Sequence, residues 1–163
     1  MNIFYLDEDL TLCAQAHCDK HVIKMLLESA QILCSVLHKT GQGAPYRATH
    51  MRHPCVIWAA KSMANWLWLK ALAKELNQEY RFRFESSKDH KSFSVISGLL
   101  LPIIKDIGLT ERPQAMPEIY QRLGDPLTAY RNYYKAEKSH LLEYRKRGLP
   151  QWLAGNEPVN NSV

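Results

Sequence analysis

The chain has 163 residues, of which 46% are hydrophobic and 23% are charged. This length and balance are those of one globular domain with its own hydrophobic core, and they exclude a disordered chain or a fibre. No apolar run reaches the ~18 residues that a membrane-spanning helix needs. The first ten residues are acidic, unlike a signal peptide. We therefore expect a cytoplasmic protein with no membrane partner.

The chain is basic. Lys and Arg number 21 against 16 for Asp and Glu, which gives a formal net charge of +5 and an isoelectric point near 9.0. This excess suits a polyanionic partner such as nucleic acid, although many soluble proteins without such a partner share it. The four cysteines lie in stretches with a helical pattern, and a reducing compartment would keep them as thiols. A disulfide framework is therefore not expected.

Two long helices are expected in the first half of the chain. Apolar residues recur at three- and four-residue steps from about Leu10 to His38, which predicts an amphipathic helix. Gly41–Pro45 ends it, and a loop continues to His53-Pro54, where the proline suits the first turn of a second helix. The second helix keeps its apolar period to about Phe84 without an internal glycine or proline.

Shorter helices are expected in the second half. Ser86-Ser87 offers an N-cap for a helix from about Lys88 to Leu101. A short helix is expected over Pro117–Leu123. Asp125-Pro126 then places an N-cap before a proline in the first turn of a last helix, which runs to about Arg147.

Strand signals are weak, since only Ile3–Leu6 has the pattern of a short extended segment. The chain has no repeat, no low-complexity tract and little linker material that would separate a second domain. We therefore predict an all-α fold: a compact single-domain bundle of four to five helices with two long core helices. The domain is expected to span residues 1–155, followed by a flexible C-terminal tail over 156–163.

The first helix carries a narrow polar stripe between apolar side chains. At about 100° per residue, these side chains fall on one face: His17, His21, Lys24, Glu28, Gln31 and Ser35. One interpretation is a partly buried helix that exposes a single polar edge to water. The other is the wall of a catalytic cleft, because two imidazoles, an amine and a carboxylate one turn apart are suited to proton transfer.

A metal site is an alternative interpretation of the same helix. Cys13, His17 and His21 follow one another at four-residue steps and so point the same way, with another histidine or cysteine as a fourth ligand. Zinc sequences usually contain a second ligand pair elsewhere, and no second cysteine pair follows here. We therefore assign no cofactor and keep this set of three as the alternative metal site.

Two further segments are candidates for phosphate binding. Tyr46–Pro54 places two arginines and two histidines directly before a helix N-terminus, which favours an anion unless His53 simply caps the helix. The last helix interleaves tyrosines with basic residues, as phosphate contact and base stacking would require, although Tyr130 and Tyr134 are expected in the core. The candidate substrate-binding residues are Lys20, Gln31, Arg47, His50, Arg52, His53, Arg81, Arg145 and Arg147.

Several segments carry a resemblance to known families. They are Met1–Phe4, His17–Met25 with Glu28 and Gln31, and His53-Pro54 followed by Trp58. Over most of its length the chain resembles a widespread set of phage-encoded and bacterial proteins. Over about its first half it also resembles, more remotely, the pyrimidine-dimer DNA glycosylase superfamily. Members of that superfamily have a D-K-[RH]-x-x-K-x-x-x-E helix and an H-P-x-x-x-W helix start.

The resemblance implies an all-α enzyme that flips a damaged pyrimidine nucleotide out of duplex DNA and attacks its sugar C1′ with the N-terminal amine. Met1 would supply this amine, Glu28 the acid/base carboxylate, and Lys20, Lys24 and Arg52 the phosphate or sugar contacts. An α-amine ordinarily has a pKa of about 8, so a fraction is unprotonated and reactive near neutral pH. The expected activity is that of a pyrimidine-specific DNA glycosylase/AP lyase in DNA repair or base modification.

Two other functions stay open at the level of sequence. One is an enzyme that acts on a free pyrimidine nucleotide or modified base in the same cleft, with or without a metal. Duplex affinity with a steep salt dependence would separate it from a DNA enzyme. The other is a non-enzymatic nucleic-acid-binding module, which would keep its binding after alanine replacement of His17, Lys24 and Glu28.

Overall fold

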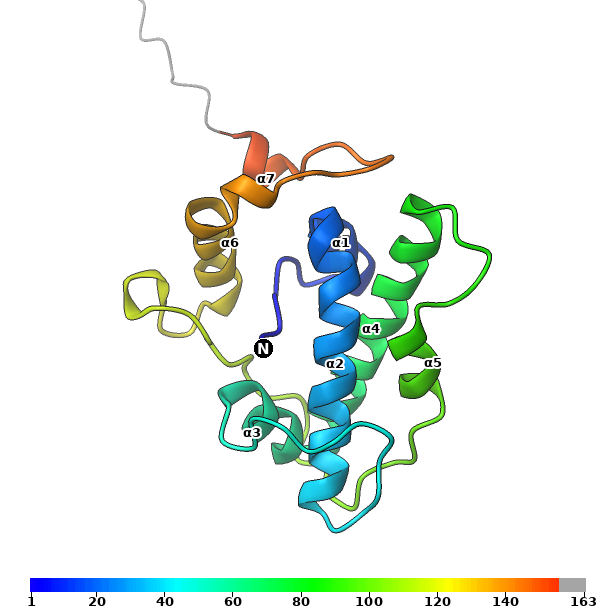
Figure 1. Cartoon of the computed structure of the whole chain (residues 1–163). Coiled ribbons are helices and arrows are strands. Elements are labelled where there is room, and N and C mark those ends of the chain that lie inside the picture. The colour runs from blue at the N-terminus through cyan, green and yellow to red at the C-terminus, as the bar shows by residue number, and fades with distance from the viewer. Residues whose placement is uncertain (156–163) are drawn as a thin grey trace, which may run out of the picture.

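The computed structural model describes residues 1–155. Over these residues the chain forms seven α-helices joined by turns and loops (Figure 1). They are α1 (Leu10–Ala16), α2 (Asp19–Lys39), α3 (Pro54–Lys61), α4 (Met63–Arg83), α5 (Lys91–Ser97), α6 (Pro126–Glu137) and α7 (Gln151–Ala154). No strand occurs over these residues. The all-α prediction is confirmed, with more helices than the four to five expected. The expected tail over 156–163 lies outside the described residues.

Each of the two long helices expected from the sequence is divided in two. His17 and Cys18 take extended backbone angles, so α1 ends at Ala16 and α2 begins at Asp19. Ser62 is likewise extended and separates α3 from α4. The apolar period continues across both breaks, because the helices on either side bury their apolar faces in the same core. The prediction of two unbroken helices is therefore wrong at these two points.

The shorter helices also differ from their expected bounds. α5 is shorter than the expected 88–101, because the His90 side chain caps its first turn. The expected helix over 117–123 is a single three-residue 3₁₀ turn, and α6 ends at Glu137 instead of near Arg147. These elements lie at the edge of the fold, where few apolar residues fix a helical period.

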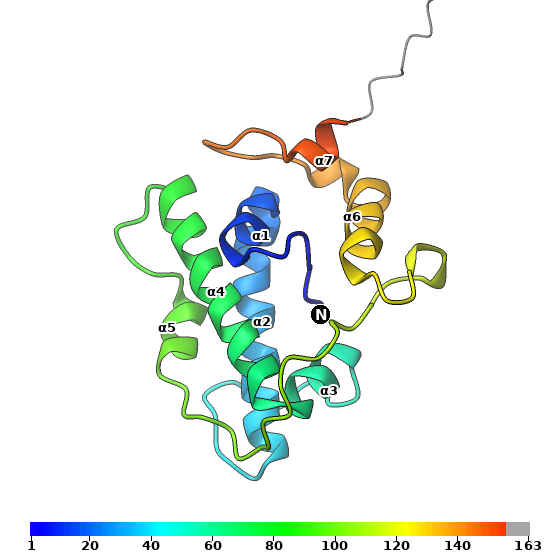
Figure 2. The same ribbon diagram turned by 180° about the vertical axis from the view of Figure 1, so that it is seen from behind.

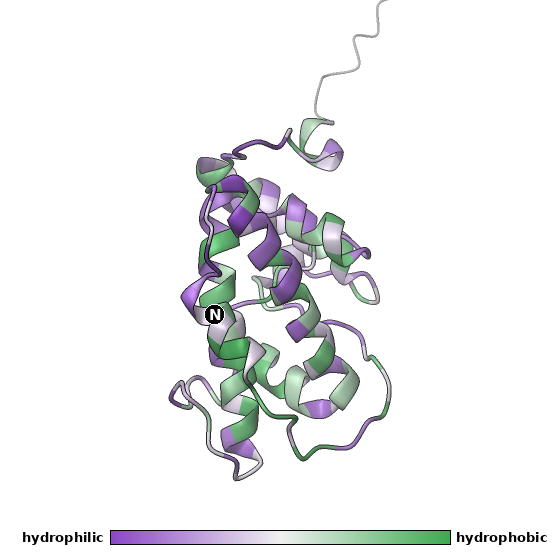
Figure 3. Cartoon of the chain, turned by 90° about the vertical axis from the view of Figure 1, so that its right-hand side faces the viewer, coloured by the Kyte–Doolittle hydropathy of each residue, from purple (hydrophilic) through white to green (hydrophobic). Residues whose placement is uncertain are grey.

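The core lies between α2 and α4, which pack side by side (Figures 1 and 2). α1 packs on α4, while α3 and α5 contact both long helices. Large buried side chains from this pair include Leu26, Ile32, Leu33, Trp66, Leu69, Leu72 and Leu76. Burying each such side chain contributes roughly 1.5–3 kcal/mol. Hydrophobic and hydrophilic stretches alternate along the ribbons, as amphipathic helices require (Figure 3).

The N-terminal segment packs between α6 and the helices of the core. Ile3–Leu6 is buried between α2 and α6, extended as its pattern suggested but not paired into a sheet within residues 1–155 (Figure 1). Tyr130 and Tyr134 of α6 are fully buried, as expected. The Tyr134 hydroxyl accepts a hydrogen bond from the Cys18 N–H at 2.8 Å. This arrangement brings the chain's first residue to a position between α2, α3 and α6.

The four cysteines are free thiols in this structure, and all are buried. Among the described helices, none combines the length and the apolar character that a membrane crossing demands.

Candidate active site

The N-terminal amine of half-buried Met1 lies beside the buried Glu28 carboxylate. The Met1 nitrogen lies 3.8 Å from Glu28 Oε1, and the two side chains are 2% and 8% exposed. Lys24, one turn earlier on α2, places its Nζ 3.7 Å from the same oxygen. The Asn2 N–H donates to Glu28 Oε2 at 2.8 Å. One carboxylate therefore faces two amino groups and a backbone donor.

Asn2 fixes the direction of the amine. Its side-chain Nδ2 donates to the Ala115 carbonyl at 2.9 Å, and its Oδ1 accepts from the Ile3 N–H at 2.8 Å. The Tyr130 hydroxyl lies 3.0 Å from the same Oδ1, and burial raises the pKa of Tyr130, so the group stays a protonated donor. Since Asn2 is held from three directions, Met1 has little freedom to move away from Glu28.

His53 lies next to this pair at the start of α3. Its Nδ1 accepts a hydrogen bond from the Cys55 N–H at 3.1 Å, so His53 is the N-cap of the helix. Burial lowers the pKa of His53, and the positive N-terminal amine of Met1 lowers it further. The imidazole beside the amine is therefore biased towards its neutral form. The Cys55 N–H is used by the cap and is not free for a phosphate.

Met1 and Glu28 line a small pocket of about 140 Å³. The N-terminal segment, α2 and the end of α6 supply its lining, which consists of Met1, Asn2, Phe4, His21, Lys24, Met25, Glu28, Tyr133 and Lys138. Lys138 Nζ lies over the Tyr133 ring, 5.1 Å from its centroid. The lining contains one carboxylate against two lysines and the N-terminal amine. This balance favours an anionic ligand.

His21 lines the pocket but does not carry charge near neutral pH. Its ring stacks on Phe4 with centroids 4.6 Å apart, and its Nδ1 lies 2.9 Å from the Tyr134 hydroxyl. Burial, followed by the nearby positive groups of His17, Lys138 and Lys24, lowers the pKa of His21 to about 3. A pKa this low disfavours the interpretation of the ring as an acid or base near neutral pH.

His17 is placed in the core rather than on a cleft wall. It is fully buried, its Nδ1 lies 2.7 Å from the Cys13 carbonyl, and burial lowers its pKa to about 4. The extended backbone at His17 and Cys18 separates α1 from α2, so His17 does not share the helical face of Lys24 and Glu28. The expected stripe of six aligned polar residues is thus wrong at its first member, and His17 does not line the pocket.

The alternative metal site is not assembled either. Within residues 1–155 no three His, Cys, Asp or Glu side chains are grouped as metal ligands require. Cys13 Sγ instead donates to the Phe4 carbonyl, and burial raises the pKa of this thiol to about 11, which disfavours the thiolate. The interpretation of Cys13, His17 and His21 as a ligand set is wrong, because the break before α2 destroys their common face.

Two arginines expected to bind substrate, Arg145 and Arg147, pair instead with the carboxylates that surround the buried Arg83. Arg83 is 2% exposed and lies 2.8 Å from Glu79 and 3.2 Å from Asp19. Arg147 binds Glu79 at 2.6 Å, and Arg145 lies 3.7 Å from Asp19. We call these five residues the Arg83 network. Arg145 and Arg147 therefore hold the C-terminal segment against α2 and α4.

The remaining expected substrate-binding residues lie outside the pocket lining. Gln31 is half-buried one turn after Glu28, and the exposed residues are Lys20, Arg47, His50, Arg52 and Arg81. Arg81 pairs with Asp89 at 3.6 Å at the far end of α4. The sequence did not single out Asn2, Tyr133 or Lys138 as site residues. The aromatic and basic pattern of the last helix contained Tyr133 and Lys138, but nothing in it separates pocket residues from packing residues.

The geometry of the site permits nucleophilic chemistry. An amine can attack an electrophilic carbon once it has lost a proton, and a carboxylate 3.8 Å away can accept that proton through one bridging water or after a small approach of the two groups. Comparisons of the chain with protein-family models, with curated proteins and with solved structures found no match. The arrangement of Met1 and Glu28 is therefore the basis on which a function can be proposed.

Proposed function

We propose that this chain is a DNA-acting enzyme of the glycosylase/AP lyase type, in which the Met1 amine attacks the sugar C1′ of a pyrimidine nucleotide. The observation that carries the proposal is the position of the Met1 amine, 3.8 Å from the buried Glu28 carboxylate, at a pocket that also contains Lys24 and Lys138. The resemblance to pyrimidine-dimer glycosylases assigns the nucleophile and the carboxylate to these same two residues.

The reaction begins when the amine transfers a proton to Glu28 and its nitrogen forms a bond to C1′. The C1′–N bond to the base breaks, and the base leaves with a proton from Glu28 or water. The nitrogen then loses a proton, the C1′–O4′ bond breaks as O4′ gains a proton, and the open sugar is left joined to Met1 as a protonated imine. Removal of a C2′ proton then breaks the C3′–O bond, which cleaves the strand.

The size of the pocket favours a polymeric substrate over a free nucleotide. Its volume of about 140 Å³ is below the roughly 300–1,000 Å³ of typical small-molecule sites. It suits the reacting part of an extruded nucleotide, with the rest of the strand lying outside. The exposed basic residues Lys20, Arg47 and Arg52 would then contact phosphates. The binding of duplex DNA should accordingly weaken steeply as salt is raised.

Borohydride trapping tests the proposal. The purified protein is incubated with duplexes that contain an abasic site, a uracil or a thymine dimer, and sodium borohydride reduces any imine to a stable adduct. We expect an adduct on a denaturing gel for at least one duplex, and loss of that adduct in Glu28→Gln. Glu85→Gln, at a side chain that is 77% exposed, is the matched control and should react normally. Failure of the folded protein to form an adduct with all three duplexes would contradict the proposal.

Two further controls concern the amine itself. Intact mass of the purified protein establishes whether the chain begins with an unmodified Met1. A version extended by glycine and serine before Met1 removes the amine from its place beside Glu28 and should not trap DNA. Thermal melting shows whether the extension disturbs the fold. An extended protein that is folded and still traps at the normal rate would exclude Met1 as the nucleophile.

A further inference from the structure

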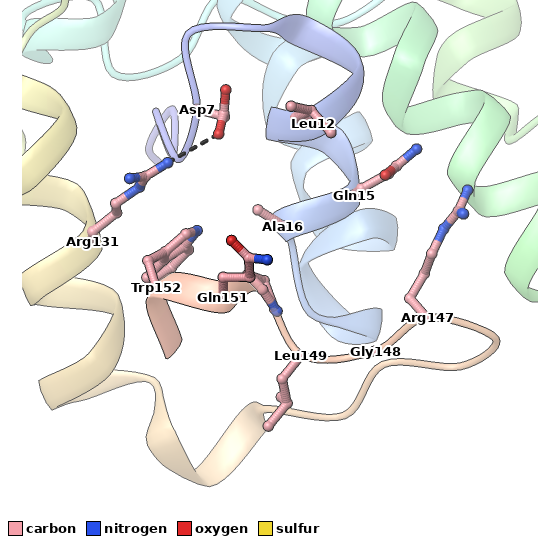
Figure 4. A pocket seen from close by; sticks show the side chains of 11 residues that line it. Asp7, Leu12, Gln15, Ala16, Arg131, Arg147, Gly148, Leu149, Gln151 and Trp152 are labelled. Carbon is pink, nitrogen blue, oxygen red and sulfur yellow. Dashed lines mark hydrogen bonds and ion pairs between the residues drawn. The ribbon is translucent and has the colours of Figure 1, made fainter. Parts of the chain in front are cut away.

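Two pockets of this molecule differ in how the charges of their linings are matched. The larger, of about 510 Å³, lies between α1, α6 and the segment that leads into α7 (Figure 4). Both arginines in its lining pair with carboxylates, Arg131 with Asp7 at 2.9 Å and Arg147 with Glu79 at 2.6 Å. Arg131 also lies over the Trp152 ring, 5.3 Å from its centroid. The charges of this lining are therefore matched within the protein.

Lys138, at the end of α6, differs from these arginines. Its side chain is half-buried and lines the smaller pocket, the candidate active site. Over residues 1–155 it pairs with no carboxylate. Its Nζ lies over the Tyr133 ring, 5.1 Å from the centroid, while the neighbouring Glu137 binds the Tyr120 hydroxyl at 2.6 Å. Lys138 therefore brings a positive charge to the pocket that no carboxylate of the described chain neutralises.

The smaller pocket has two ends along α2. His21 and Glu28 both line it and are seven residues apart, which corresponds to about 10 Å along the helix axis. Glu28 marks the end that contains the amine. Burial lowers the pKa of His21 to about 3, and the positive charge of Lys138 lowers it more than that of Lys24 does. Lys138 therefore lies towards the His21 end, where the neutral imidazole carries no charge of its own.

Aromatic side chains line the same end of the pocket. The Phe4 ring stacks on His21 with centroids 4.6 Å apart, and the Tyr133 ring lies 6.4 Å from Phe4 at 21° from parallel. Both Phe4 and Tyr133 belong to the lining. Aromatic surface is what receives an extruded base, whereas the sugar of the same nucleotide must lie at the amine and the carboxylate. A nucleotide bound for attack at C1′ therefore directs its base towards Tyr133 and Lys138.

We propose that Lys138 is a catalytic residue that stabilises the pyrimidine base as it leaves, an inference that rests on the proposed function and deepens it. When the C1′–N1 bond breaks, its electron pair moves onto N1, and the negative charge spreads to the carbonyl oxygens of the ring. The Lys138 ammonium donates a hydrogen bond to one of these oxygens, and N1 then takes up a proton from Glu28 or water. Such a group lowers the barrier because it interacts more strongly with the developing charge than with the intact nucleotide.

The test compares two kinds of duplex. Strand cleavage at a uracil or a thymine dimer requires a base to leave, whereas an abasic site has already lost its base and needs only imine formation and elimination. Under single-turnover conditions, Lys138→Met should slow cleavage of the base-containing duplex about 100-fold, as the loss of one such donor does. Cleavage of the abasic duplex should keep the parent rate, because no base departs. Lys138→Gln, which also lacks the charge, should show the same difference between the duplexes.

Two further variants serve as controls. Lys135→Met removes an equal charge from the same helix, outside the pocket lining, and should leave both cleavage rates unchanged. Lys138→Arg keeps a cation at the site and should recover most of the lost rate. Thermal melting shows whether each variant is folded.

Two results would overturn the role of Lys138 and leave the proposed function intact. Equal slowing on both kinds of duplex in Lys138→Met and Lys138→Gln would assign Lys138 to phosphate binding, and parent rates on both would remove it from the reaction. A parent protein that forms no borohydride-trapped adduct with any duplex would instead contradict the proposed function, and the role of Lys138 with it.

Discussion

The Arg83 network and the Met1–Glu28 pair both contain buried charge, but they differ in how completely that charge is matched. Arg83 is almost inaccessible, and all three of its guanidinium nitrogens donate to protein oxygens within 3.2 Å. Glu28 also accepts several donors, yet one wall of its site is an open pocket. Completeness of pairing is what separates a structural cluster from a candidate active site.

Removing the central arginine should have the largest effect. Arg83→Met leaves the buried carboxylates of Glu79 and Asp19 without their main partner, which should cost about 3–5 kcal/mol in the free energy of unfolding. Denaturant unfolding measures this loss. Arg145→Ala is the control, since Arg145 is 66% exposed and an exposed pair contributes about 0–1 kcal/mol. Equal losses in the two variants would contradict a structural role centred on Arg83.

Glu28→Gln should affect chemistry far more than stability. Glutamine cannot accept the proton from the amine, so the rate of strand cleavage should fall at least about 100-fold. Its side-chain oxygen can still accept the hydrogen bond from the Asn2 N–H, so the melting temperature should change little. Single-turnover kinetics measure the rate of strand cleavage, and thermal unfolding measures the melting temperature. If Glu28→Gln lowers the melting temperature and leaves the cleavage rate unchanged, Glu28 has a structural role like the carboxylates of the Arg83 network.

The buried histidines predict a pH dependence of stability. His17 has an ordinary pKa near 6.5 when unfolded and a pKa of about 4 when folded, so the unfolded state binds a proton that the folded state does not. Stability is unaffected above pH 6.5 and falls as the pH drops towards 4, by at most ~1.4 kcal/mol per pH unit for each such histidine. Unfolding free energies between about pH 7 and pH 5 measure the slope.

Replacing His17 tests this assignment. His17→Phe removes one titrating group and should reduce the slope by up to ~1.4 kcal/mol per pH unit, with the share of His21 remaining, whereas His140→Ala, at an exposed histidine, should leave the slope unchanged. An unaltered slope in His17→Phe would assign the pH dependence to other groups.

The smallest effect is expected at the rim of the first pocket. Lys24 is 64% exposed, so Lys24→Ala should leave stability within about 1 kcal/mol of the parent protein. If Lys24 contacts a phosphate, duplex binding should weaken and the slope of log affinity against log salt should fall by about 1. Lys39→Ala, an exposed lysine at the other end of α2, is the matched control. Identical salt slopes for the two variants would remove Lys24 from the DNA contacts.

The helical class and the core faces of α2 and α4 could be predicted from the sequence. Apolar residues that recur at three- and four-residue steps over a long segment indicate an amphipathic α-helix and the face that it buries. The breaks at His17 and Ser62 could not, since the apolar repeat runs through both. The role of Arg147 was also hidden. Its carboxylate partner Glu79 is 68 residues away along the chain. The sequence around Arg147 therefore does not show whether its guanidinium pairs with a carboxylate or is free to bind a ligand.

The candidate site was partly accessible from the sequence. The family resemblance implies that Met1 and Glu28 act together. In the structure the Met1 nitrogen and Glu28 Oε1 are 3.8 Å apart. The supporting residues were not accessible: Asn2 is held by the Ala115 carbonyl, 113 residues away, and Lys138 comes from the end of α6. Both depend on how α6 and the preceding loop fold back onto the N-terminal segment, which local patterns do not encode.

The most direct test of the central claim is peptide mapping of the borohydride-trapped adduct by mass spectrometry. We expect the reduced sugar on the α-amine of Met1 and on no lysine. An adduct on Lys24 or Lys138, the two other amines at the pocket, would contradict the claim that the N-terminal amine is the nucleophile.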